Sequence, residues 1–370
     1  MKSAHYNYDK DTIMTNNNMI ACTMVLLVVI YHSLLIMSNC WYNNFIPEHT
    51  PAFEITPLYG IIVQFLNNMH VPILFIISGY TFSYKMMYTN TYNDVSIYIR
   101  KKIFRLAIPF LLISLLWIIP IYAELSPECL PDLIRCFPFN FCQLWYISIL
   151  FIILITARLT WSLTKSNMVT YVVANICCAF VIATIIQRAT TSTILQATIY
   201  VHAGILIQKY DIIEKFTASN KILTSIAYAI ALLDVTMLIN KRISDPMFNV
   251  YLRPFYMLPI IIFLIMSKYL LLNTKLRNKF EHSKSYNILR TYQYRVYLLH
   301  EQLLVIFAIL TVNRIPMIFA VLISFISAIL VSMFISKLLC QLYFGKILFG
   351  ENTNGSMISI NTITSKIFKI

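Results

Sequence analysis

Ten long apolar segments, separated by short polar loops, constrain what this chain can fold into. A membrane-spanning helix needs about 20 mainly apolar residues, which is roughly the length of these segments. Inside a bilayer the backbone must satisfy its own hydrogen bonds, and a helix does so within one segment. The sequence therefore predicts an all-α, polytopic bundle of about ten transmembrane helices. The predicted segments are 19–38, 58–83, 103–123, 143–163, 169–187, 191–208, 222–239, 251–272, 292–313 and 315–343.

The composition agrees with a membrane protein. Of 370 residues, 59% are hydrophobic and 12% are charged, and the mean hydropathy is +0.71. A soluble domain of this length does not have such a composition. The first apolar run is too long for a secretory signal peptide and lacks a small-residue cleavage site, so we expect a retained helix. We expect one membrane domain over residues 1–349 and a short cytoplasmic tail over residues 350–370.

The net charge of +14 is distributed in a way that orients the chain, and it does not indicate a nucleic-acid partner. If the segments alternate from a cytoplasmic N-terminus, most Lys and Arg lie on the cytoplasmic side, which is the positive-inside pattern. We expect a multi-pass protein of the inner (cytoplasmic) cell membrane, with both termini cytoplasmic and basic loops facing anionic membrane lipid. The opposite side holds only Arg135, Arg188, Lys241, Arg242, Arg253 and Arg314.

The eight cysteines lack the spacing of a metal site, and we expect neither a metal nor a bound cofactor. Cys129 and Cys136 form the closest pair in a predicted outer loop, where an oxidising compartment would permit a disulfide. Free thiols are the alternative for this pair.

His32 is the only strongly polar side chain in the apolar run from Met19 to Met37. An ionisable residue inside a membrane helix is energetically costly and is by default a candidate functional residue with a partner elsewhere. From a cytoplasmic N-terminus, His32 lies about 20 Å along the helix, towards the outer side.

The second apolar segment combines polar residues with a proline. Pro72 removes one backbone hydrogen bond, which predicts a kink or a break in the helix. The freed carbonyl must be satisfied by neighbours or must line a cavity. Asn67, Asn68 and His70 come just before it, so we expect a polar pocket near the middle of the membrane.

Four cations precede or enter the third segment at its predicted cytoplasmic end: Arg100, Lys101, Lys102 and Arg105. An anchor at the membrane surface explains the first three, but Arg105 lies one turn further in. A cationic cluster at the mouth of a pocket suits a phosphate-bearing donor such as a coenzyme A thioester. Lys102 and Arg105 are therefore candidate donor-binding residues.

The ninth segment places His300 and Glu301 about 12 Å from its inner end. Apart from Asp234, Glu301 is the only acid in the middle of a predicted span. A carboxylate there would be protonated or paired. Arg295 or a histidine is the expected partner, and a structural polar clamp is the alternative. His202 in the sixth segment has no supporting motif, and we expect it to be a packed histidine.

Taken in order, these residues resemble the acyltransferase-3 family of integral-membrane O-acyltransferases, and most closely its bacterial surface-polysaccharide O-acetyltransferases. The resemblance implies that acetyl-CoA, bound from the cytoplasm, donates an acetyl group to a hydroxyl of a lipid-linked or nascent glycan. Its most specific piece is Val-Pro…Phe-x-x-Ser-Gly-Tyr. The matching pieces are His32, then His70-Val71-Pro72 through Phe75 to Ser78-Gly79-Tyr80, then Arg105-Leu106 with Pro109, Leu144-Trp145-Tyr146-Ile147 and Tyr297-Leu298-Leu299-His300-Glu301.

The resemblance implies that His32 is catalytic, and we assign His300 and Glu301 to the same centre. A neutral imidazole can remove the hydroxyl proton during attack, or it can carry the acyl group as a covalent intermediate. Both routes stay open. Candidate donor or substrate contacts are Arg105, Lys102, His70, Ser78, Gly79 and Trp145. Helix packing is the alternative for Ser78 and Gly79, and the interfacial aromatic belt is the alternative for Trp145.

One position departs from the family pattern. The family usually has a basic residue, commonly Arg, eleven positions before the histidine, and here that residue is Ala21. The acid often found slightly earlier is replaced by Asn18 or its neighbours. Either another cation serves the donor, with Arg105 the first choice, or the chain is an inactive accessory subunit of glycan synthesis. A glycan or lipid transporter, with the intramembrane His and Glu lining its path, is the remaining alternative.

Overall fold

A computed structural model describes residues 10–37, 57–89, 92, 94–138, 141–164, 167–186, 191–218, 221–244, 257–311 and 314–351, and these contain helices and no strand. Outside the described residues lie Cys40, Arg188, Arg253 and everything after Glu351. The side chains of Cys129, Asp234, Lys241 and Arg242 also lie outside the described part. The long helices are α1 (Lys10–Met37), α2 (Pro57–Met87), α7 (Trp145–Leu163), α8 (Met168–Ile186), α9 (Thr191–Lys209), α11 (Lys221–Ser244), α12 (Leu258–Leu272), α14 (Lys284–Thr311) and α15 (Met317–Leu339).

The third predicted segment is a stack of short helices. These are α3 (Val95–Lys102), α4 (Ile108–Ile113) and α5 (Ile119–Leu125), joined by π-helical turns at Ile103–Ala107 and Ser114–Ile118. Pro109 and Pro120 come two residues after these turns. Each proline lacks the N–H that a regular α-helix uses, which accounts for the local change in winding.

Shorter elements connect the long helices. Asp94 caps the start of α3 by accepting a hydrogen bond from the Ile97 amide, and Asn273 does the same for the Leu276 amide of α13. Such caps satisfy amides that have no partner inside the helix. The short elements are α6 (Leu130–Cys136), α10 (Ile212–Ala218), α13 (Thr274–Glu281), α16 (Tyr343–Leu348) and the 3₁₀ turns Pro127–Cys129 and Cys142–Leu144.

Each of the ten predicted apolar segments is helical where the structure describes it. Among the described residues, six stretches are long and apolar enough to cross a membrane, and α12 with α13, bent by 90°, would make a seventh. The predicted all-α polytopic class is confirmed, and the predicted number of ten spans is approximate. The six stretches are Lys10–Met37, Leu58–Met87, Val95–Leu125, Cys142–Leu163, Lys284–Thr311 and Met317–Leu339.

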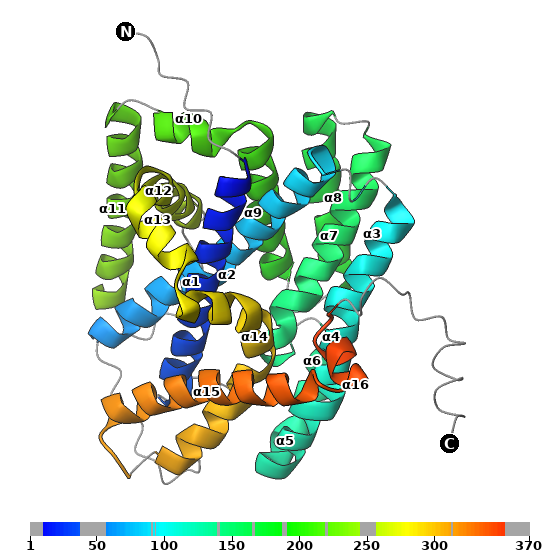
Figure 1. Ribbon diagram of the computed structural model, residues 1–370, viewed down its shortest axis with the longest axis vertical. Coiled ribbons are helices and arrows are strands. Elements are labelled where there is room, and N and C mark those ends of the chain that lie inside the picture. Colours follow the sequence, from blue (N-terminus) through cyan, green and yellow to red (C-terminus); the bar gives the residue numbers. More distant parts are fainter. Residues whose placement is uncertain are drawn as a thin grey trace.

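Helix α1 lies in the middle of the bundle, and Figure 1 shows α2 beside it and α15 crossing its lower part. It packs against α2, α14, α15 and α12. Its apolar residues cover all sides of the helix, which is the pattern of a buried helix. The side chain of Ser33 on α1 donates a hydrogen bond of 3.1 Å to the Val321 carbonyl of α15.

Helices α2 and α9 touch backbone to backbone. A Cβ atom at Gly79 would lie 1.9 Å from the Val201 carbonyl oxygen, and one at Gly204 would lie 1.9 Å from the Ile76 carbonyl oxygen. Only glycine permits this approach, so Gly79 packs against a helix. Of the kink or break predicted at Pro72, the break does not occur, because α2 continues through this proline as one helix. Helices α9, α1 and α12 pack against α2, and neighbouring helices of this kind allow a proline inside a membrane helix.

Candidate active site

A histidine and a carboxylate meet in the interior of the bundle. His32 on α1 and Glu301 on α14 are 4% and 0% exposed, and His32 Nδ1 lies 3.6 Å from Glu301 Oε2. A buried carboxylate requires such a partner because its charge has lost contact with water. Of the two partners predicted for Glu301, the structure selects a histidine and pairs Arg295 with another acid.

Tyr122 contributes a third member to this group. Its buried hydroxyl, on α5, donates a hydrogen bond of 3.2 Å to Glu301 Oε1. The two carboxylate oxygens therefore contact different groups, and together they form a chain of polar contacts from Tyr122 through Glu301 to His32. Sequence reasoning missed Tyr122, because a tyrosine at the end of an apolar run carries no signal of its own.

Two further histidines lie next to His32. The ring of His300 meets the ring of His32 edge to face, with 5.2 Å between their centroids. His300 Nδ1 lies 2.7 Å from the Tyr297 carbonyl oxygen, so this nitrogen carries the ring proton. His70 contacts the group through Tyr31, at 4.7 Å between ring centroids. The structure thus brings together His32, His300 and Glu301, which sequence analysis assigned to one centre, and His70, a predicted substrate contact, lies beside them.

Two glutamines fix the position of α14 beside this cluster. Gln143 Nε2 donates to Gln302 Oε1 at 2.9 Å, and Gln302 Nε2 donates to Gln143 Oε1 at 3.2 Å. The Tyr297 hydroxyl donates to the Gln143 carbonyl. Both glutamines are buried, where paired amides are strongly preferred over unpaired ones. This pair ties the start of α7 to the helix that carries Glu301.

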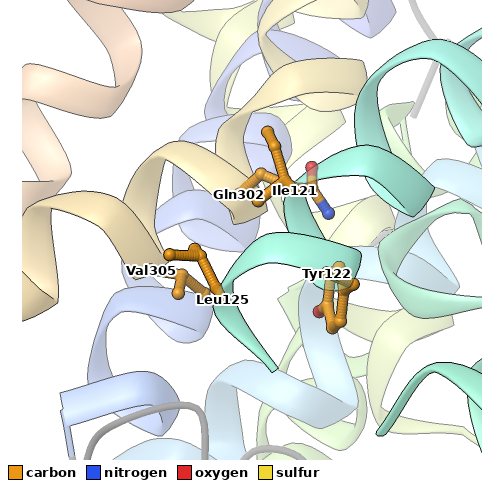
Figure 2. A pocket seen from close by; sticks show the side chains of 5 residues that line it. All are labelled: Ile121, Tyr122, Leu125, Gln302 and Val305. Carbon is orange, nitrogen blue, oxygen red and sulfur yellow. The ribbon is translucent and has the colours of Figure 1, made fainter. Parts of the chain in front are cut away.

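A small apolar hollow lies between α5 and α14, next to the cluster (Figure 2). It contains about 180 Å³ of space between atoms, part of which is open to the outside. Tyr122 and Gln302, which flank Glu301, belong to its wall, so the hollow brings an apolar surface close to the reactive groups. The lining residues are Ile121, Tyr122, Leu125, Gln302 and Val305.

A second cluster consists of cations packed against aromatic rings. Lys102 Nζ lies 5.5 Å from the ring centroid of Tyr92 and 5.4 Å from that of Tyr98, and Lys85 Nζ lies 5.6 Å from that of Tyr92. Arg105 is exposed and lies within electrostatic range of both lysines. In the part of the chain that the structure describes, these three cations form no salt bridge. Sequence reasoning found Lys102 and Arg105 and missed Lys85.

Tyrosines connect the two clusters along α14. The Tyr294 hydroxyl donates to the Arg105 carbonyl at 2.8 Å. Further along α14, Tyr297 contacts Tyr146 at 5.6 Å and His300 at 5.7 Å between ring centroids. Residues three or four positions apart share one face of a helix, so this face leads from Arg105 towards His32.

The remaining predicted residues lie around this face. Ser78 Oγ is 2.8 Å from the Leu74 carbonyl and 3.3 Å from the Tyr146 hydroxyl. Trp145 begins α7, and its ring lies 6.4 Å from that of Phe75. Substrate contacts for Ser78, Gly79 and Trp145 stay predictions. His202 is a packed histidine as expected, because it is buried and its Nδ1 lies 2.7 Å from the Thr198 carbonyl.

The cysteines and acids show no metal site or disulfide in the described residues. Cys136 and Cys142 are free thiols, so of the two alternatives left open for Cys129 and Cys136 the free thiol holds for Cys136. Over the same residues, no group of three or more His, Cys, Asp or Glu side chains is arranged to hold a metal ion.

Comparison with known families identifies the type of protein. The family model described as an acyltransferase domain matches residues 22–337, and this range includes His32, Arg105, His300 and Glu301. The chain belongs to the acyltransferase-3 family. It is therefore a membrane acyltransferase in general terms. No curated protein and no solved structure matches the chain.

Position 21 of this acyltransferase is the half-buried Ala21. The structure places the exposed Arg290 of α14 within electrostatic range of Cys22, the next residue of α1. Arg290 is therefore a cation near position 21, where the family usually has a basic residue. No pattern around position 21 indicates this cation, because Arg290 belongs to a distant segment.

Proposed function

We propose that this acyltransferase transfers an acetyl group from acetyl-CoA to a hydroxyl of a surface polysaccharide or a lipid-linked glycan. The observation that carries the proposal is the buried His32–Glu301 pair, backed by Tyr122, in a chain of the acyltransferase-3 family. An imidazole held by a carboxylate is the arrangement that general-base catalysis uses on a hydroxyl.

In the proposed reaction Glu301 holds His32 through Nδ1, which leaves Nε2 to accept a proton. His32 Nε2 takes the proton of the acceptor hydroxyl while the hydroxyl oxygen attacks the thioester carbonyl carbon. The carbon–sulfur bond then breaks, and the sulfur leaves with the proton from the His32 imidazolium as the thiol of coenzyme A. Tyr122 stabilises the Glu301 carboxylate throughout by its hydrogen bond.

The cationic cluster supports a phosphate-bearing donor. Lys85, Lys102 and Arg105 concentrate positive charge with no acidic partner among the described side chains. Phosphate groups bind such cations through charge-assisted hydrogen bonds. The tyrosine face of α14 then connects this cluster to His300 beside His32.

The test compares the surface glycan by mass spectrometry in cells with the gene deleted, restored, and restored as His32→Ala. The expected result is one added acetyl mass per modified sugar that requires both the gene and His32. His202→Ala is the matched control, because it removes another buried histidine away from Glu301. Unchanged acetylation in the deletion would refute the proposal. Glycan that accumulates inside the cell or is missing from its surface would instead favour transport or an accessory role.

The proposal places the protein in the inner membrane with both termini in the cytoplasm. In a variant whose native cysteines are replaced by serine, Thr89→Cys should react only with reagents that enter the cell. Asp132→Cys, in the predicted outer loop, should react with reagents that do not cross the membrane. The opposite labelling pattern would overturn this orientation.

A further inference from the structure

The last described part of the chain folds back onto the donor side of the bundle. We call residues 343–351 the C-terminal strap; it contains α16 and ends at Glu351. Figure 1 shows α16 beside α4, and the two helices are in contact. The strap lies beyond the residues that match the family, 22–337. Its position is therefore a property of this chain that the family match does not supply.

The strap packs against the backbone at Arg105 and leaves the Arg105 side chain exposed. Gly350 has a φ of +62°, and a Cβ atom there would lie 3.0 Å from the Arg105 Cα. The preceding side chain, Phe349, is buried. Sequence analysis placed Gly350 and Glu351 in the tail, whereas the structure packs both against the bundle.

Glu351 at the end of the strap forms an ion pair with Arg295. The Arg295 guanidinium on α14 donates to Glu351 Oε1. The same guanidinium lies 4.8 Å from the ring centroid of Tyr292 and 5.9 Å from that of Phe349. The Arg295 side chain is 11% exposed and the Glu351 side chain is 34% exposed. Arg295 is thus held in the bundle, whereas its partner Glu351 is more accessible from the surface.

Arg295 is also connected to the cationic cluster. Its neighbour Tyr294 donates the hydrogen bond to the Arg105 carbonyl. The strap thus contacts the backbone of Arg105 and the side chain of Arg295. Through these contacts Arg295 lies near Arg105, which belongs to the group of cations proposed to bind the donor.

We propose that Arg295 is an anion-binding residue of the donor site and that Glu351 is an internal occupant which a phosphate group of the donor displaces. The inference rests on the proposed function for the identity of that donor. A guanidinium binds a carboxylate and a phosphate through the same fork of N–H groups. A donor that must displace Glu351 binds with an affinity lowered by the fraction of molecules whose site is open.

The experiment measures dissociation constants by calorimetry for the purified full-length chain in lipid nanodiscs. The two probes are coenzyme A and inorganic pyrophosphate. Glu351→Gln should lower both dissociation constants by about fivefold, because the competing charge is gone. Arg295→Gln should raise both by about tenfold, because a charge-assisted contact to phosphate is lost. Glu281→Gln is the matched control, since it breaks the Arg277–Glu281 pair on α13.

Each outcome decides between the two proposals. If Glu351→Gln tightens pyrophosphate but not coenzyme A, the anion site stands and the proposed donor fails. If coenzyme A binds equally to all variants, the donor stands and the site at Arg295 is refuted. Binding of neither probe to any variant would refute both. If Arg295→Gln does not fold, Arg295→Lys replaces it. It should still weaken binding, because it keeps the charge and loses the fork.

Discussion

The His32 centre (His32, Glu301 and Tyr122) and the cationic cluster (Lys85, Lys102 and Arg105) differ in how their charged groups are surrounded. In the centre, Glu301 contacts both His32 and Tyr122 and has no exposed surface. In the cluster, Lys102 lies against aromatic rings and Arg105 is exposed, and no acid pairs with either in the described residues. Glu301 thus has its polar partners within the protein, whereas the cations have no acidic partner among the described residues and are available to the anionic donor that we propose.

This difference has an energetic basis. A buried ion pair that loses one member leaves a charge without water and without a partner. An exposed cation keeps its hydration, and salt screens it. We therefore expect substitutions in the centre to change the rate of the chemical step. Substitutions in the cluster should change donor binding in a salt-dependent way.

The largest effect is expected for His32→Ala. Loss of the general base should reduce acetyl transfer by about 10³-fold, within the usual range for such groups. Transfer of radiolabelled acetyl from acetyl-CoA to glycan, measured with purified protein, checks this. His202→Ala should retain transfer, since its imidazole only packs in the bundle. Equal losses in both variants would mean that His32 is structural.

Glu301→Gln should reduce kcat by about 10²-fold, because the amide no longer orients and stabilises the His32 imidazolium. The donor KM should not change. The Tm should not fall, because glutamine keeps the shape of the side chain and removes a buried charge. A changed KM with an unchanged kcat would move Glu301 from the chemical step to substrate binding and would break the contrast between the regions.

Arg105→Gln should raise the donor KM by about tenfold at low salt, with kcat retained, because one charge-assisted contact to phosphate is lost. The difference from the parent protein should shrink at high salt. Lys275→Gln, on the exposed helix α13, is the control for a general loss of surface charge. The same KM in both variants at every ionic strength would show that the cluster does not bind the donor.

The smallest effect is expected for Tyr122→Phe, which removes one hydrogen bond of 3.2 Å to Glu301. A fall in kcat of about fivefold follows from the loss of one such bond, with little change in KM. Tyr171→Phe is the matched control, because Tyr171 is also buried and its ring packs against Trp161 and His202, away from Glu301. An identical kcat in Tyr122→Phe would show that Glu301 holds His32 without this support.

Several site residues were found from sequence because a polar group inside an apolar run is conspicuous. His32, His300 and Glu301 stand out in this way, and the structure brings them together. The expected alternative partner of Glu301, Arg295, is instead held by Glu351, which no local pattern could indicate. Tyr122 was missed because a tyrosine is ordinary at the end of an apolar segment. Of the kink or break expected at Pro72, the break did not occur, because neighbouring helices pack against α2 and such packing permits a proline inside a membrane helix.

The sequence by itself determined that the chain is helical and membrane-embedded, because long apolar runs must close their backbone hydrogen bonds within each segment. It also determined which ionisable groups lie inside those segments. The tertiary structure alone decided which groups meet. Tyr122 and Glu301 are 179 positions apart, and Arg295 and Glu351 are 56 apart. Such pairs depend on how whole helices pack, and side-chain periodicity within one helix carries no information about its neighbours.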